Sequence, residues 1–157
     1  ELRAWIGGTF FAQDVEFVWE GSCAIIRELV VGPIWDRLCA LGESIVGREL
    51  SMIMPPDKAL SSALGFISGT LDMVYRDPHS GEFVIVDYKT DRASSLEDLQ
   101  ERAQAYSGQG RIYTEAMKRA LNLDYDPAFE LWFLRYGTIL RAQISKTPRK
   151  SRENPRV

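Results

Sequence analysis

The residues that could do chemistry gather in one stretch, GEFVIVDYKTDR, which runs from Gly81 to Arg92. Its apolar run ends on Asp87, and Lys89 follows two residues later. Successive side chains of a strand point to opposite faces, so Asp87 and Lys89 are expected to share a face. A carboxylate and an ammonium side by side at the end of a buried strand can bind a hard cation and orient a nucleophile.

A second carboxylate comes from the preceding strand. The turn DPHSGE separates GTLDMVYR from FVIVDYKT, and its Pro and Gly are typical of a hairpin. With a four-residue turn at 78–81, antiparallel pairing sets Asp72 across from Asp87 and Thr70 across from Lys89. Directly opposed residues have Cβ atoms only about 4.5–5.5 Å apart, where like charges destabilise a sheet. Two such carboxylates need a compensating cation, or one of them holds a proton.

A divalent metal ion meets that need. Carboxylate oxygens favour Mg²⁺ or Mn²⁺, which bind one or two protein carboxylates together with phosphate oxygens of a substrate. Such an ion can activate water for attack on a phosphodiester, while Lys89 orients the nucleophile or holds the pentavalent centre. The alternative is that Asp72, Asp87 and Lys89 form a solvated ion-pair cluster; their facing geometry after an apolar lead-in favours the metal site.

The opposite face of this hairpin is predicted to be core. It pairs three apolar residues of one strand with three of the other, namely Leu71, Met73 and Tyr75 with Tyr88, Val86 and Val84.

A helix is predicted after the hairpin, over residues 96–122. Tyr106, Gln109 and Tyr113 lie three and four residues apart in it, so they share one stripe. Tyr113 fits a core position, whereas a glutamine in that stripe needs polar partners. DNA phosphate, a metal-bound water or the strand-end cluster could supply them. The glycines on either side of Gln109 indicate close approach of another backbone or a local break in the helix.

The other elements place these strands in an α/β fold. Residues 1–47 predict one or two helices with a break at Gly32-Pro33, residues 49–54 a short strand, and residues 57–66 a loop or helical turn. Ser94 or Ser95 is a candidate N-cap for the helix, and residues 130–136 predict a last strand. This order predicts helices around a mostly antiparallel sheet that gains a crossover strand.

Composition narrows the class of protein. The 157 residues suffice for one domain, and a net charge of −3 argues against a purely charge-driven nucleic-acid binder. Cys23 and Cys39 lack zinc-site spacing and are expected to be buried thiols in a reducing compartment, which predicts a cytoplasmic protein. No apolar run approaches the ~18 residues of a membrane span. The basic segment 146–157 is predicted to be a disordered tail.

GTLD, the following DYKT and the pattern Tyr106-x-x-Gln109-x-x-x-Tyr113 together resemble the RecB-type branch of the PD-(D/E)XK nucleases. This is the nuclease domain of RecB and AddA helicase–nucleases and of related exonucleases. The resemblance covers about residues 49–136. It implies a restriction-endonuclease-like core with a central mixed sheet flanked by helices, in a single domain over residues 1–145. Residues 1–47 would be its helical N-terminal part and residues 48–137 its catalytic core.

The resemblance also implies a role for each matching residue. Members of the family cut DNA by Mg²⁺-dependent phosphodiester hydrolysis, in which Mn²⁺ can replace Mg²⁺. Branches that carry an iron–sulfur cluster use four cysteines, and this chain has 2, so no cluster is expected. The implied metal ligands are Asp72, Asp87 and the carbonyl of Tyr88, the implied catalytic lysine is Lys89, and Gln109 and Tyr113 would contact DNA or support the site.

One expected ligand is missing. RecB-type nucleases usually place a metal-binding histidine on an upstream helix, whereas the single histidine here, His79, lies in the predicted hairpin turn. Either the ligand lies outside this sequence or an acid replaces it, with Glu16, Glu20, Glu28 and Glu43 as candidates. Glu49 opens the strand before the hairpin and could approach the site or remain an exposed strand-end acid.

The sequence therefore predicts a Mg²⁺-dependent DNA exonuclease domain, acting in recombinational repair or foreign-DNA degradation. DNA is the expected substrate, and a helicase domain or subunit is the expected partner. The alternatives are a catalytically inactive DNA-binding or scaffolding module on the same fold, and a phage-type or stand-alone exonuclease that needs no motor.

Overall fold

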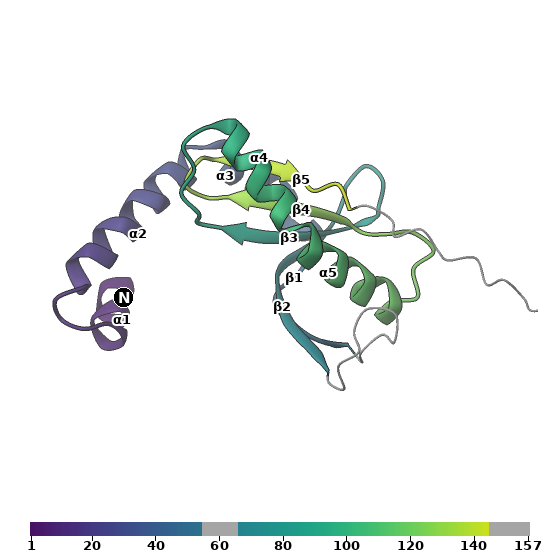
Figure 1. Cartoon of the computed structure of the whole chain (residues 1–157), viewed down its shortest axis with the longest axis horizontal. Helices are drawn as coiled ribbons and strands as arrows, with labels where there is room; N and C mark the ends of the chain where they lie inside the picture. The colour runs from purple at the N-terminus through teal and green to yellow at the C-terminus, as the bar shows by residue number, and fades with distance from the viewer. Residues whose placement is uncertain (55–65, 145–157) are drawn as a thin grey trace, which may run out of the picture.

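The computed structural model describes residues 1–54 and 66–144, and these form a sheet with helices on both faces (Figure 1). Residues 57–65 of the loop predicted over 57–66, and the predicted tail at 146–157, lie outside the described residues. The elements follow one another as α1 (Leu2–Thr9), α2 (Val15–Val30), α3 (Pro33–Leu41), a 3₁₀ turn η1 (Gly42–Ser44), β1 (Ile45–Met54), β2 (Ile67–Arg76), β3 (Phe83–Lys89), α4 (Leu96–Ala105), α5 (Ser107–Ala120), β4 (Ala128–Phe133) and β5 (Thr138–Arg141).

The five-stranded sheet has the order β1-β2-β3-β4-β5. β3 and β4 are parallel, and the other neighbours are antiparallel. A parallel pair needs a crossover connection, which α4 and α5 supply. The mixed sheet and the crossover strand confirm the predicted α/β class. The strand predicted over residues 130–136 is β4, which runs from Ala128 to Phe133. Gly137, at a φ of +57°, then turns the chain into β5, a strand that was not predicted.

β3 is the central element because both of its faces are covered. Each residue from Phe83 to Asp87 is buried, as the unbroken apolar run predicts. On one face, α4 and α5 pack through a cluster of Leu71, Val74, Phe83, Ile85, Leu99, Ala103, Tyr113, Met117, Phe129, Leu131 and Phe133. On the other face, α3 packs through Ile34, Leu41, Met73, Tyr75, Val84, Val86 and Trp132.

The second face also holds a polar network. The Tyr75 hydroxyl accepts a hydrogen bond from Arg37 at 3.0 Å and donates one to Glu130 at 3.1 Å. Trp132 Nε1 donates to the same Glu130 oxygen at 3.0 Å. Burial raises the pKa of Tyr75 to about 12, so the phenol stays protonated. The hydrogen bonds of this network connect α3, β2 and β4.

The β2–β3 hairpin has the predicted turn and register. The Asp77 amide donates to the Glu82 carbonyl at 2.8 Å, and the pairs run from Arg76↔Phe83 to Met73↔Val86. His79 lies in this turn with its side chain 93% exposed, as predicted.

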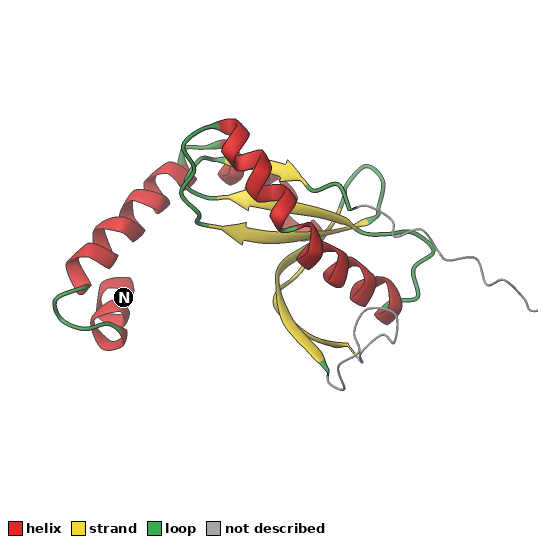
Figure 2. Cartoon of the chain, viewed as in Figure 1, coloured by secondary structure: helices red, strands yellow, loops and turns green. Residues whose placement is uncertain are grey.

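The hairpin departs from the prediction beyond Met73. Asp72 leaves the backbone ladder, and its Oδ2 accepts a hydrogen bond from the Tyr88 amide at 2.6 Å. Thr70 pairs with Ser51 of β1 and not, as predicted, with Lys89. β1 and β2 curve away from the other strands at this point (Figure 2). The sequence signals the strands but not this divergence.

The divergence also moves Leu71 to the other face. Leu71 was predicted beside Met73 and Tyr75, but it packs with Val74 in the cluster under α4 and α5. Alternation along β2 therefore breaks between these residues. Opposite the break, Glu49 of β1 has a φ of +51°, which marks an irregular position in β1 as well.

The predicted helix over residues 96–122 is two helices that meet at Tyr106. Ser95 is the N-cap of α4, and its Oγ accepts a hydrogen bond from the Asp98 amide at 3.2 Å. Of the two glycines beside Gln109, Gly110 faces the ring of Phe129, whereas Gly108 has open space at its Cβ position. The close neighbour is thus a side chain of β4 and not a backbone.

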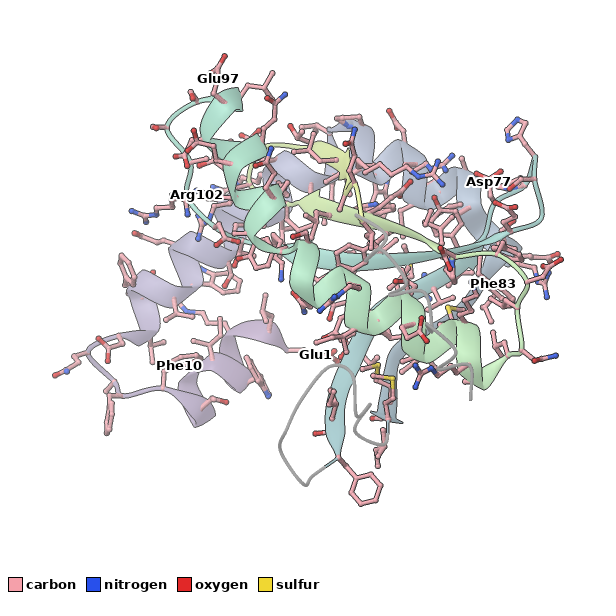
Figure 3. All side chains as sticks on the ribbon, turned by 45° about the vertical axis from the view of Figure 1, so that its right-hand side comes forward. Glu1, Phe10, Asp77, Phe83, Glu97 and Arg102 are labelled. Atoms are coloured by element: carbon pink, nitrogen blue, oxygen red, sulfur yellow. The ribbon has the colours of Figure 1, made fainter. Side chains whose placement is uncertain are left out.

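The N-terminal region has three helices where one or two were predicted, and Gly32-Pro33 breaks the chain between α2 and α3 as expected. α1 and α2 project from the sheet as an arm, on which Figure 3 labels Phe10. Ile6 is the only buried residue of α1, and α2 has none. The two cysteines are free, but the prediction that both are buried is wrong, because Cys39 is exposed and Cys23 is only half-buried. No helix within the described ranges is long and apolar enough to cross a bilayer.

We predict opposite effects for the two glycines of α5. A Cβ at position 110 would lie 2.4 Å from Cδ1 of Phe129, whose ring is buried and cannot move aside. Gly110→Ala is therefore expected to destabilise the fold by about 1–3 kcal/mol. Gly108→Ala is the matched control and is expected to be neutral or to stabilise by up to about 1 kcal/mol, because alanine favours a helix. Urea unfolding measures both; equal effects at the two positions would contradict the packing described.

Candidate active site

The site is built around the carboxylate of Asp87, which is 4% exposed at the end of β3. Its Oδ1 accepts a hydrogen bond from Gln109 Nε2 at 2.9 Å. Its Oδ2 lies 2.5 Å from Lys89 Nζ and, within the described part of the chain, has no other polar partner. The predicted sharing of one face by Asp87 and Lys89 thus holds in the structure.

Gln109 joins the helix to the strand end. Its Oε1 accepts from Lys89 Nζ at 3.2 Å, and its Nε2 donates to Asp87 and to the Tyr113 hydroxyl at 3.0 Å. These partners use both ends of the amide and define which end faces the ammonium. Of the partners that the sequence left open for this glutamine, the structure supplies the strand-end cluster.

Tyr113 supports the site from inside the core. It is 9% exposed, and its ring meets the Phe129 ring edge-on at a centroid distance of 6.2 Å. Gly69 of β2 packs on the other side, where a Cβ would come within 3.1 Å of the Tyr113 ring. In this structure the hydroxyl of Tyr113 reaches the site through Gln109.

Asp72 lies on the neighbouring strand, where β2 leaves β3. It is half-buried, and the hydrogen bond from the Tyr88 amide fixes one of its carboxylate oxygens. Its charge acts on Asp87: burial is the largest cause that raises the pKa of Asp87, and repulsion from Asp72 adds to it. The hydrogen bond and charge of Lys89 and the hydrogen bond from Gln109 work in the opposite direction. The two acids are thus electrostatically coupled.

Tyr106 contacts Lys89 and Asp91 contacts Tyr106; neither residue was assigned a role from the sequence. The Lys89 ammonium lies 3.8 Å from the centroid of the Tyr106 ring. The Tyr106 hydroxyl donates to Asp91 Oδ1 at 2.9 Å. Tyr106 was visible as the first member of the helical stripe, but its contact with Lys89 depends on the break between α4 and α5. In the sequence, Asp91 could be recognised only as an acid two residues after Lys89, which does not predict its hydrogen bond to Tyr106.

The oxygens at this site suit a hard divalent cation. Asp87 Oδ2 is a buried carboxylate oxygen whose polar contact among the described residues is the Lys89 ammonium, and Asp72 brings a second carboxylate from the adjacent strand. The described residues contain no group of three or more His, Cys, Asp or Glu side chains placed to hold a metal. A cation bound here would take the two aspartates together with main-chain and solvent oxygens.

None of the acids considered as a replacement for the histidine joins this pair within the described ranges. Glu16 is on α2 and pairs with Arg3 at 2.5 Å. Glu49 comes nearest in register: the pairs Arg48↔Met73 and Leu50↔Leu71 flank it, so it lies across from Asp72, with an exposed side chain.

The parallel pair of β3 and β4, its helical crossover and the neighbouring cluster of Asp72, Asp87 and Lys89 agree with the class of protein that comparison with known families shows. The family model of the PD-(D/E)XK nuclease superfamily matches residues 28–153, and the chain belongs to this superfamily. A relative is an ATP-dependent helicase/nuclease subunit of Anoxybacillus flavithermus, which is 38% identical over 69 residues. That match covers 41% of this chain and 6% of the relative, so the chain corresponds to a small part of that protein. The family resemblance inferred from the motifs is confirmed.

We predict that the stability of the protein falls as Asp87 ionises. Its folded-state pKa is raised, so its contribution to the free energy of unfolding is greatest below the ordinary aspartate pKa of about 3.9 and is lost as the pH rises through the folded-state value. Asp87→Asn removes this titration. The stability of the variant relative to the parent should therefore increase across the pH range above the ordinary aspartate pKa of about 3.9 in metal-free buffer. Urea unfolding across that range measures the difference; a constant difference would contradict the raised pKa.

Proposed function

We propose that this chain is a divalent-metal-dependent deoxyribonuclease domain that hydrolyses phosphodiester bonds at the site of Asp72, Asp87 and Lys89. The observation that carries the proposal is the contact of Lys89 Nζ with the buried carboxylate of Asp87, at 2.5 Å, beside a second aspartate on the adjacent strand. Burying such a charged cluster costs stability, and buried charged clusters of this kind concentrate at functional sites.

Asp72, Asp87 and the main-chain carbonyl of Tyr88 are the groups that would hold Mg²⁺, or Mn²⁺ in its place. When bound, the ion supplies Lewis-acid stabilisation of the phosphate and lowers the pKa of a bound water. The residues of the chain contribute a fixed set of oxygens: Gln109 orients the Asp87 carboxylate, and the Tyr88 amide orients that of Asp72. Neither carboxylate has to reorganise when charge develops on the substrate.

Lys89 contributes a positive charge close to the scissile phosphate. Its ammonium is a donor with three hydrogens, and its side chain is 14% exposed, so it acts where water is largely excluded. In the reaction one water is consumed: its oxygen bonds to phosphorus, the bond from phosphorus to the leaving sugar oxygen breaks, and that oxygen gains a proton. Lys89 would orient the attacking water and stabilise the charge on the phosphate oxygens. Gln109 holds the ammonium in place, and Tyr113 holds Gln109.

The finer assignment is that the domain is an exonuclease of the RecB/AddA type, used in recombinational repair or foreign-DNA degradation in the cytoplasm and linked to a helicase. The motifs DYKT and Tyr106-x-x-Gln109-x-x-x-Tyr113 support this assignment. So does the relative, whose name describes a helicase/nuclease. Because the match spans 6% of that relative, the helicase link is a proposal about the protein that carries this domain.

Lys89→Ala is expected to lower the rate of Mg²⁺-dependent DNA cleavage by about 10²- to 10⁴-fold, because it removes the charge beside the reacting phosphate. The variant leaves the buried Asp87 carboxylate without its ammonium and is expected to lose stability, although Lys89 is the last residue of β3 and contributes no core side chain. Gel assays on end-labelled linear DNA measure the rate, and circular dichroism checks the fold.

The matched control for that variant is Lys118→Ala, which removes a lysine of α5 that pairs with Asp126 on the surface. It should cleave at the rate of the parent. An exonuclease degrades linear DNA and spares covalently closed circles, so both substrates belong in the assay. Unchanged cleavage by Lys89→Ala would rule out the assigned site, and cutting of the circle would rule out the exonuclease assignment alone.

A second candidate function is a non-catalytic DNA-binding or scaffolding module. It is favoured by the compensation of both acids within the chain: Lys89 neutralises Asp87, and the Tyr88 amide occupies an oxygen of Asp72. The proposed nuclease should bind Mn²⁺ in calorimetry, and Asp87→Asn should weaken that binding by at least about 10-fold, since it removes a charged ligand. If the parent and Asp87→Asn show the same heats, the non-catalytic module is the better description.

A further inference from the structure

The ammonium of Lys89 has an aromatic support that the proposed reaction does not itself require. Its Nζ lies 3.8 Å from the centroid of the Tyr106 ring, well within the range of about 6 Å in which a cation is attracted to a ring face. The Lys89 side chain is 14% exposed, and the attraction is stronger where water is excluded. The ring therefore contributes to where the charge sits.

Tyr106 is itself fixed from two directions. Its backbone is the junction of α4 and α5, and its amide donates to the Arg102 carbonyl at 3.3 Å. Its hydroxyl donates to Asp91 Oδ1 at 2.9 Å, in the loop that follows β3. Asp91 lies two residues after Lys89, so the loop that follows β3 supplies the acceptor for the Tyr106 hydroxyl.

A lysine needs such a support more than an arginine does. Its ammonium is a point charge on a flexible four-carbon stem, and holding it in one place costs side-chain entropy. Asp87 and Gln109 contact this ammonium, and the Tyr106 ring adds a third contact. Together the three contacts define one position for the charge.

We infer that Tyr106 is a positioning residue, whose ring fixes the Lys89 ammonium beside Asp87, and that the hydrogen bond to Asp91 fixes the ring. The contact with Lys89 stands on the geometry alone; its effect on rate rests on the proposed nuclease function.

Kinetics separate the ring from the hydroxyl. Tyr106→Leu removes both and is expected to lower kcat for linear DNA by about 10- to 100-fold, with KM within about 2-fold, because a displaced catalytic group affects the chemical step. Tyr106→Phe keeps the ring and should lose no more than about 10-fold. Asp91→Ala should match Tyr106→Phe, and the double variant should be no slower than either single variant, since all three break one hydrogen bond.

A spectroscopic measurement tests the contact without DNA or metal. Protons on Cε of a lysine above a ring face shift upfield, and the Lys89 signal is assigned by its loss in Lys89→Arg. The shift should be present in the parent and in Tyr106→Phe, and absent in Tyr106→Leu. A Lys89 signal that is unchanged in Tyr106→Leu overturns the inference, as does a Tyr106→Phe variant that is as slow as Tyr106→Leu.

The matched control is Tyr125→Leu. Tyr125 also lies at the edge of the core under α4 and α5, and its hydroxyl accepts from the Phe83 amide at 3.0 Å, but it does not contact Lys89. This variant should lose stability and keep both kcat and the Lys89 shift; an equal loss of kcat would mean that Tyr106 acts only through the core. If the parent itself cleaves no DNA, the proposed function fails, and the Lys89 shift still decides whether Tyr106 positions the ammonium.

Discussion

The structure depends on one buried carboxylate. Asp87 lies two residues before the end of a strand that is covered on both faces, and it is only 4% exposed to solvent. An isolated charge in that position would be very costly, so the fold has to supply partners from elsewhere in the chain. Lys89 supplies an ammonium from the same strand, and Gln109 supplies an amide from a helix that begins about twenty residues later. This contact joins α5 to β3 in addition to the apolar packing between the helix and the sheet.

The divergence of β2 from β3 serves the same site. A regular ladder would place Asp72 directly opposite Asp87, where the two charges repel. Instead the ladder stops at Met73, and Asp72 takes the Tyr88 amide as its partner. The carboxylate thus replaces a backbone acceptor, which keeps the buried amide satisfied while the strands separate. Leu71 changes face as a result, and β1 and β2 continue as a curved pair (Figure 2).

Much of this could be predicted from the sequence because the signals were local. The apolar run before Asp87, the turn at 78–81 and the Ser95 cap are short-range patterns, and they gave the hairpin register and the start of α4 correctly. The stripe containing Gln109 predicted that a polar partner existed but not which one. Three features were not predicted, because local patterns do not encode them: the divergence at Asp72, the break at Tyr106 and the contact of Tyr106 with Lys89. These arise from competition between packing surfaces that lie far apart in sequence. The arrangement of α1 and α2 failed for a related reason, since Ile6 is the only buried residue of these two helices.

The crossover between β3 and β4 has a consequence for the order in which the protein becomes complete. Gln109 and Tyr106 both lie inside this connection, between two strands that are neighbours in the sheet. A nascent chain that has emerged only as far as β3 already contains both aspartates and the lysine, but no amide to bridge them and no ring to support the ammonium. Assembly of the site is thereby tied to closure of a long-range loop, which is an entropically slow step. During synthesis, the unfinished domain carries the acidic residues without their organised surroundings.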